Sequence, residues 1–295
     1  MIKTFSAIYS TESDTEKWVL LISTGNSTGV STGPNMQYFI GSFDGKKFIN
    51  ENPNDTVLWV DYGPDSYAGA TYNLLHNKSR IFQSWMNRWD YAESLSFNVW
   101  NGQMALPRIL KLINNSENKL FLSSLPVPQF ESLRIGSMSV KDIELKSSQK
   151  FSLFNSDQKV LSLLDIELTV DTNDHQMNDT FGVEFSRDND KLLVYFNGSF
   201  VIDRTNAGRH DFSKYYGLVY KAPRLTACPL MNLRLILDRS SVELFADNGL
   251  TSMTSIFLSK ELQASKVTLF YKSMNESSKL SLIDVNVHQL KSIWK

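Results

Sequence analysis

The segment from residue 59 to 108 gathers carboxylates and aromatic side chains of a kind that recognises sugars. Its four carboxylates are Asp61, Asp65, Asp90 and Glu93. They stand among aromatic residues that include Trp59, Tyr62, Tyr67, Trp85, Trp89 and Tyr91. Flat aromatic faces stack on the apolar side of sugar rings, and carboxylates accept hydrogen bonds from sugar hydroxyls. The pattern therefore indicates carbohydrate chemistry, although composition alone favours a plainer interpretation, in which the tryptophans fill a β-core and the acids cap turns.

Other chemistries have weaker support in the sequence. Ser240 and Ser241 stand beside Asp238, but no histidine is near enough in sequence to complete a catalytic triad. The glycines within residues 25–33 are not followed by a helical pattern, so a phosphate-binding loop is not expected. A single cysteine, Cys228, and four scattered histidines lack metal-ligand spacing. We therefore expect no metal and no cofactor.

Composition and charge limit the classes of partner that the protein is expected to bind. Hydrophobic residues make up 42% of the 295 residues and charged residues 21%, as in a globular protein with a sizeable core. The net charge of −1 removes the usual electrostatic case for nucleic acid or an anionic membrane surface. No apolar run approaches the roughly 20 residues of a membrane span, and no N-terminal stretch resembles a secretion signal. We expect neither a nucleic-acid nor a membrane partner.

Strand and turn patterns dominate the chain, and no stretch shows helical periodicity over more than two turns. Residues 164–170 alternate strictly between apolar and polar side chains, as in a half-buried strand. Hairpin turns are predicted at Asp44-Gly45, Asn197-Gly198 and Asp247-Asn248-Gly249, whose residue types suit positive φ. The sequence therefore predicts an all-β protein. Further strands are predicted at 18–23, 56–60, 97–106, 232–238, 266–272 and 280–288.

The composition changes near residue 113. Residues 1–112 hold five of the six tryptophans, and they are followed by the polar sequence INNSENK and the proline-containing LSSLPVPQ. Polar and proline-containing stretches commonly join domains. We therefore predict a linker over 113–137, followed by a β-sandwich over 138–295.

Five segments together resemble glycoside hydrolase family 32, the family of invertases, inulinases and levanases. DYGPDSYAGATY resembles the family's D-x-G-x-D-[FY]-Y-A motif, and SWMNRWDYA resembles its W-M-x-N-W-x-Y motif. WNGQMALPRILKL is similar to W-R-G-x-M-[ST]-[LI]-P-R-E-L, and LRLILDRSSVELFADNG to a strand pair of the family's C-terminal sandwich. The stretch from WVLLISTGN to SFDGKKF resembles the region that follows the acid/base motif. The ordered matches spread from about residue 17 to 258, which makes coincidence improbable.

This resemblance implies a five-bladed β-propeller, with the active site at one end of its channel, followed by a β-sandwich. A four-stranded blade takes about 40–50 residues, so 1–112 corresponds to the C-terminal part, about half, of such a propeller. The family's nucleophile lies in N-D-P-N-G, a transition-state-binding aspartate in R-D-P and the acid/base glutamate in E-C-P. None of these motifs occurs in the sequence. We therefore expect the nucleophile and the acid/base upstream of Met1 and no catalytic residue within the chain.

Two substrate-binding residues carry over from the resemblance. Asp65 matches the second aspartate of D-x-G-x-D-[FY]-Y-A, which hydrogen-bonds hydroxyls of the fructosyl unit. Trp85 matches the first tryptophan of W-M-x-N-W, which lines the fructosyl-binding subsite. Asp61, Tyr67 and Trp89 are weaker pocket candidates, because residues at such positions support a pocket from behind as readily as they line it. The alternatives for Asp65 and Trp85 are a turn-capping acid and a core tryptophan.

Arg108 has a different expected role. It lies in the Leu-Pro-Arg part of the fourth motif, and we expect it to pair with a carboxylate at the boundary between propeller and sandwich. The sequence departs from the family at two nearby positions, with Ile109 in place of glutamate and Asn101 in place of arginine. These departures concern the details of the boundary rather than the resemblance itself.

Three functional hypotheses follow. The first is the C-terminal portion of a β-fructofuranosidase-type hydrolase, which cleaves β-fructosyl bonds in sucrose, inulin or levan by a retaining reaction and is inactive as this chain alone. The alternative is a non-catalytic fructan-binding or interaction protein, and a third hypothesis is an enzyme assembled with a separate N-terminal chain. A full-length parent would be secreted or vacuolar. An open propeller exposes a blade face and a strand edge, so we expect self-association there.

Overall fold

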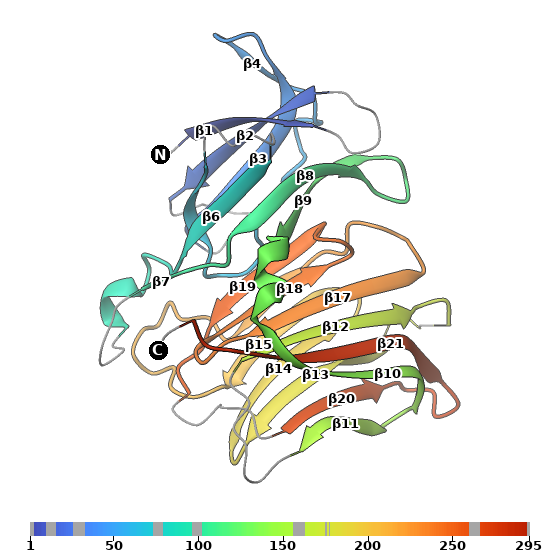
Figure 1. The fold of residues 1–295 in the computed structure, drawn as a ribbon. Helices are drawn as coiled ribbons and strands as arrows, with labels where there is room; N and C mark the ends of the chain where they lie inside the picture. The colour runs from blue at the N-terminus through green and yellow to red at the C-terminus, as the bar shows by residue number, and fades with distance from the viewer. Residues whose placement is uncertain are drawn as a thin grey trace.

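The chain folds into two bodies of antiparallel β-sheet, as a computed structural model shows (Figure 1). The structure describes residues 3–9, 16–25, 33–72, 79–95, 102–155, 163–174, 176, 178–259 and 266–293. Within these residues, the regular elements are strands and two short 3-10 helices, η1 (Ala92–Ser94) and η2 (Pro128–Leu133). The prediction of an all-β protein is confirmed. No helix in this part of the chain is long and apolar enough to cross a membrane.

The N-terminal body consists of two sheets that share one core. The first sheet has the strand order β1-β2-β3-β4, and the second has the order β5-β6-β8-β9 with β7 beside β6. The core between them includes Val19, Leu21, Tyr38, Phe82 and Leu110. The strands are β1 (Lys3–Tyr9), β2 (Glu16–Thr24), β3 (Asn35–Phe43), β4 (Phe48–Asn50), β5 (Tyr67–Thr71), β6 (Arg80–Met86), β7 (Gln103–Met104), β8 (Arg108–Asn114) and β9 (Leu120–Pro126).

The C-terminal body consists of two six-stranded sheets that face one another across a single large core, the arrangement of a β-sandwich. One sheet has the order β10-β21-β12-β17-β18-β19, and the other β11-β20-β13-β14-β15-β16. The strands are β10 (Arg134–Lys146), β11 (Lys150–Asn155), β12 (Leu164–Asp171), β13 (Thr180–Arg187), β14 (Asp190–Phe196), β15 (Phe200–Asn206), β16 (Val219–Ala222), β17 (Leu230–Leu237), β18 (Ser241–Ala246), β19 (Thr251–Ile256), β20 (Lys266–Lys272) and β21 (Lys279–Leu290).

Most of the predicted strands and hairpins are present. The alternating stretch at 164–170 is β12, whose apolar residues enter the sandwich core. Gly198, at φ 85°, turns the hairpin between β14 and β15, and Asp247, Asn248 and Gly249 all have positive φ between β18 and β19. These turns need positive φ, which glycine and asparagine adopt at little cost.

Two sequence-based expectations differ from the structure. The strand predicted at 56–60 is reduced to a single bridge between Trp59 and Gln37, because this segment leaves β4 to run toward the other body. In the segment predicted at 97–106, only β7 is described as strand, and residues 97–101 lie outside the described residues.

The expected linker over 113–137 also differs. The polar sequence INNSENK covers the end of β8 and the hairpin turn at 115–119, and β9 pairs with β8 along its whole length. Ser124 in β9 donates its backbone N–H to the carbonyl oxygen of Gly249 at 2.9 Å, so this hairpin contacts the sandwich directly. The connection between the two bodies is therefore 127–133, most of which is η2. Composition does not locate this boundary, because a polar hairpin turn and a polar linker have the same residue types.

Candidate functional site

Three of the predicted aromatic residues lie together on the sheet of β5 and β6. Tyr67 stands directly opposite Trp85 in the antiparallel register, so both side chains project from the same face. The ring of Trp85 lies 4.9 Å from the ring of Trp89, with an angle of 55° between their planes. Trp89 is 60% exposed, whereas Tyr67 and Trp85 are half-buried. We call these three residues the aromatic patch.

The local sequence explains how the patch forms. In β6, Phe82 and Met86 point into the core, so the period of two places Trp85 on the opposite face. The strand ends after Met86, where the side-chain oxygen of Asn87 accepts a hydrogen bond from the backbone N–H of Arg88 at 2.8 Å. The turn that follows brings Trp89 back beside Trp85.

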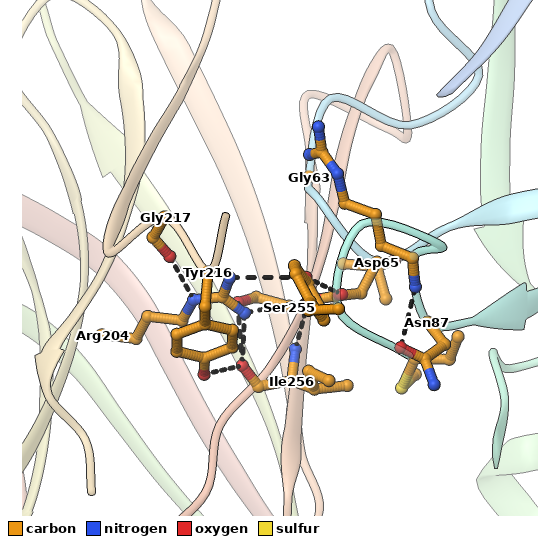
Figure 2. Close-up of polar contacts among 12 residues, drawn as sticks. Gly63, Asp65, Asn87, Arg204, Tyr216, Gly217, Ser255 and Ile256 are labelled. Atoms are coloured by element: carbon orange, nitrogen blue, oxygen red, sulfur yellow. Dashed lines mark hydrogen bonds and ion pairs between the residues drawn. The ribbon is translucent and has the colours of Figure 1, made fainter. Parts of the chain in front are cut away.

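Asp65 lies behind the patch and is fully buried. One of its carboxylate oxygens accepts a hydrogen bond from the hydroxyl of Tyr91. The other accepts from the guanidinium of Arg204 at 3.0 Å and from the backbone N–H of Ile256 at 2.8 Å (Figure 2). Both carboxylate oxygens accept hydrogen bonds from the protein, and neither is exposed. In this structure, Asp65 therefore presents no oxygen atom to fructosyl hydroxyls, the contact predicted from the sequence.

Asp61 is likewise buried, and it belongs to a second charged cluster. Nη1 of Arg108 donates to Asp61 at 2.8 Å, and Nη2 donates to Glu243 at 2.6 Å and to the hydroxyl of Thr254 at 2.6 Å. Thr254 in turn donates its hydroxyl and its backbone N–H to Asp61. The prediction that Arg108 pairs with a carboxylate is confirmed, and its partners come from both bodies. Asp61 stabilises this contact and does not line an open pocket.

The segment that carries both aspartates runs along β19, the last strand of its sheet in the sandwich. Tyr62 donates its backbone N–H to the carbonyl oxygen of Ser252 at 2.8 Å, and Asp65 donates its own to that of Thr254 at 3.1 Å. A Cβ atom at Gly63 would lie 2.2 Å from the carbonyl oxygen of Thr254, which explains the glycine. The aspartates therefore satisfy backbone groups that this edge strand would otherwise expose.

Both clusters are buried, so desolvation acts on their charged groups. Burial raises the pKa of Asp65, against the lowering effect of Arg204, and burial raises the pKa of Glu243 against that of Arg108. Burial, together with the charge of Asp65, holds the pKa of Tyr91 well above its ordinary value, so its hydroxyl stays a donor. A buried carboxylate of this kind depends on its arginine, because an unpaired buried charge is costly.

No group of three metal-ligating side chains occurs among the residues that the structure describes. A hollow of about 330 Å³ opens between the β8–β9 turn and residues 224–227, lined by Asn115, Lys119, Phe121 and Arg224 among others. None of its lining residues belongs to the predicted site. The aromatic patch, with its exposed Trp89, therefore carries the candidate site.

Comparison with known proteins decides the family. Residues 3–124 match the glycosyl hydrolases family 32 N-terminal domain, and residues 129–289 match the family 32 C-terminal domain. The chain belongs to glycosyl hydrolase family 32. The resemblance inferred from the five motifs is confirmed.

Curated relatives in family 32 are longer than this chain. A levanase of Bacillus subtilis (strain 168) is 31% identical over 293 residues, covering 95% of this chain and 41% of the levanase. An extracellular exo-inulinase of Aspergillus niger is 28% identical over 296 residues, covering 94% of this chain and 52% of that protein. The chain therefore spans about half, or less, of the length of these relatives.

Solved structures of family 32 enzymes share the fold. An exo-inulinase from Aspergillus awamori superposes with a TM-score of 0.81 at 24% identity, over 99% of this chain and 57% of that one. A β-fructofuranosidase from Schwanniomyces occidentalis, solved with fructosyl-erythritol, gives a TM-score of 0.82 at 21% identity, over 98% of this chain and 59% of that one. The likeness covers both bodies of the present chain.

The aromatic patch of this family 32 chain is recognisable from the sequence, but the residues that support it are not. Tyr91 is the tyrosine of SWMNRWDYA, two residues after Trp89, and this spacing is the sequence feature that points to its supporting role. Arg204 lies in β15 with no motif around it, 139 residues after Asp65. Glu243 lies in the sandwich motif LRLILDRSSVELFADNG, so a search for a carboxylate partner of Arg108 among the motif residues would have found it.

Proposed function

We propose that this chain is the C-terminal portion of a β-fructofuranosidase-type glycoside hydrolase and that it contributes the aromatic patch to a fructoside-binding site. Relatives with the names levanase and exo-inulinase match along nearly the whole chain, which supports a β-fructoside as the ligand. The observation that carries the proposal is the exposed contact of Trp89 with Trp85, opposite Tyr67. Adjacent aromatic faces of this kind suit the apolar side of a furanose ring.

The proposed reaction divides between this chain and residues that it lacks. Retaining hydrolysis needs a nucleophilic carboxylate and an acid/base carboxylate about 5–5.5 Å apart. The family's three catalytic motifs do not occur in the sequence, and Asp61 and Asp65 are occupied by Arg108 and Arg204. In the proposed enzyme, the preceding part of the propeller supplies both carboxylates. The present chain then orients the fructosyl ring by stacking and shields it from water.

The sheets of the N-terminal body fit the role of propeller blades. Each is an antiparallel meander of four principal strands, and the inner residues of β2 pack against the second sheet. On the outer side of β2, Trp18, Leu20 and Ile22 are half-buried. An antiparallel sheet with a solvated face usually carries polar residues there, so an apolar outer face suits a further blade that covers it.

The test of the proposed ligand site is direct binding. Replacing Trp85 or Trp89 with alanine is expected to raise the Kd for inulin, levan or sucrose by about five- to tenfold, because one stacked aromatic face is lost. Tryptophan fluorescence and isothermal calorimetry measure this. Tyr215→Ala is the matched control, since Tyr215 is a 57% exposed aromatic residue of the sandwich. Equal affinity in all variants, or no binding by the unaltered chain, contradicts the proposal that the patch binds fructosides.

The apolar outer face of β2 and β3 carries a second prediction, self-association. Leu20 stands directly opposite Phe39, and the rings of Trp18 and Phe43 lie 5.1 Å apart. We expect the chain at micromolar concentration to form dimers or larger species through this face, because burying it removes apolar surface from water. Size-exclusion chromatography with light scattering measures the mass of the species in solution.

A charge on that face is expected to reverse the association. Leu20→Lys places an ammonium group at the centre of the face, so this variant should elute as a monomer. The control is Lys141→Glu, a change at an exposed position of β10 in the other body. A monodisperse monomer of the unaltered chain contradicts the prediction.

A further inference from the structure

The aromatic patch is held from behind by a hydrogen bond between the two segments that form it. Asp65 lies two residues before Tyr67, and Tyr91 lies two residues after Trp89. The hydroxyl of Tyr91 donates to Asp65, so this bond closes a ring through β5, β6 and the turn that carries Trp89. The relative position of Tyr67 and Trp89 therefore depends on the Asp65–Tyr91 contact.

A residue of the sandwich holds both members of this contact. Arg204 in β15 is fully buried, and its Nη1 donates to Asp65 at 3.0 Å (Figure 2). Its Nη2 lies 3.5 Å from the hydroxyl of Tyr91, and its guanidinium carbon lies 5.9 Å from the centre of the Tyr91 ring. The planar guanidinium thus contacts the carboxylate and the phenol at the same time.

The guanidinium of Arg204 is itself fixed by the sandwich. Nε donates to the carbonyl oxygen of Gly217 at 2.8 Å, and Nη1 donates to that of Ile256 at 2.6 Å. The ring of Tyr216 lies against it at 3.6 Å, and the hydroxyl of Tyr216 also donates to Ile256 at 3.0 Å (Figure 2). These contacts leave the guanidinium one orientation, which is the orientation that faces Asp65 and Tyr91.

Packing adds to the same anchor. The ring of Tyr91 meets the ring of Tyr216 at 5.3 Å and that of Phe212 at 6.3 Å, both edge to face. Tyr91 is buried in a cluster that both bodies form, whereas Trp89, two residues earlier, is exposed. The turn therefore has one end in the sandwich and the other in the patch.

We propose that Arg204 is a positioning residue through which the sandwich sets the geometry of the aromatic patch. Arg204 acts through Asp65 and Tyr91, which precede Tyr67 and follow Trp89. The sandwich then acts on saccharide affinity as well as on stability. The affinity part of this proposal rests on the proposed function, whereas the geometric part stands without it.

The experiment measures the geometry of the tryptophan pair without any sugar. Two tryptophans in contact give an exciton band in the far-ultraviolet circular dichroism, which disappears when the pair separates. In the full chain, Trp89→Phe identifies the band, and Tyr91→Phe and Arg204→Met are expected to reduce it by at least half. Arg204→Lys keeps the positive charge but loses the planar guanidinium. It is therefore expected to show part of the band that Arg204→Met loses. Arg224→Met is the matched control, because Arg224 is a sandwich arginine bonded to Asp247 and Cys228.

The second readout is the Kd for inulin by fluorescence titration. We expect Tyr91→Phe to raise it by roughly fivefold or more, the effect of losing one buried hydrogen bond to a charged group. A full exciton band and an unchanged Kd in folded Tyr91→Phe and Arg204→Lys overturn the proposal, whether or not Arg204→Met folds. If the unaltered chain binds no fructan, the proposed function fails, and the exciton band still decides the positioning role.

Discussion

Replacing Arg108 with methionine is expected to lower the free energy of unfolding by about 3–5 kcal/mol, because two buried carboxylates lose the cation that they share. Arg108 is fully buried, and its guanidinium bridges Asp61 of the N-terminal body and Glu243 of the sandwich. Methionine keeps most of the volume, so the loss is mainly electrostatic. Urea unfolding followed by circular dichroism measures it from the midpoint and slope.

Two further variants separate the charge effect from packing. In Arg108→Met with Asp61→Asn and Glu243→Gln, no carboxylate of the cluster is left charged and unpaired, so about half or more of the lost stability should return. Lys17→Met is the matched control, because it removes an ion pair at the surface. Nζ of Lys17 lies 2.5 Å from a carboxylate oxygen of Glu51, and both side chains are partly exposed. That change is expected to cost about 0–1 kcal/mol. A loss below about 1 kcal/mol in Arg108→Met contradicts the buried, paired cluster.

The second large effect concerns catalysis. The chain alone is expected to release fructose from levan, inulin or sucrose no faster than buffer does. Hydrolysis with retention needs two carboxylates on either side of the glycosidic bond, and Asp61 and Asp65 are each held by a buried arginine. A reducing-sugar assay of the purified chain measures the rate. A null rate needs a positive control in the same assay, and the longer relatives provide one.

That control is a fusion. A levanase segment that carries the family's three catalytic motifs, joined to this chain, is expected to raise the rate at least about a million-fold over buffer. In the fusion, Trp85→Ala should lower kcat/KM by about five- to tenfold. If the chain alone hydrolyses fructans and Trp85→Ala weakens that activity, the catalytic pair lies within these residues and the proposal is wrong.

A third outcome favours the alternative function. If the chain binds fructan through the aromatic patch, but neither the chain nor the fusion hydrolyses it, a non-catalytic sugar-binding protein is the better account. The hypothesis of an enzyme assembled from two chains predicts hydrolysis instead. The activity should then appear when the levanase part is added to this chain as a separate protein. The binding and rate measurements together therefore distinguish all three functions.

The family and much of the fold are predictable because their signals are local. The motif SWMNRWDYA places Trp85 and Trp89 in one strand and the turn after it, and the strict alternation at 164–170 predicts β12. Glycine and asparagine at the hairpin turns report a backbone conformation that few other residues adopt. Each of these signals depends on neighbours within a few residues.

The sequence-based expectations differ from the structure where one local sequence pattern fits two different tertiary environments. Asp61 and Asp65 stand among aromatic residues, a pattern that fits a sugar site as well as a buried interface. Their actual partners, Arg108 and Arg204, lie 47 and 139 residues away, and no periodicity connects them. The polar turn at 115–119 has the composition of a linker in the same way, because only the pairing of β8 with β9 distinguishes the two.

Residue types at short spacing are enough to establish the family, the all-β class and the aromatic residues of the candidate site. The burial of both aspartates behind that site is a property of the tertiary structure. The physical reason is that a carboxylate paired with a buried arginine stabilises the fold, whereas an unpaired one is free to bind a ligand. Arg204 reaches Asp65, and Glu243 and Thr254 complete the cluster around Arg108 and Asp61, only when the sandwich lies against the N-terminal body.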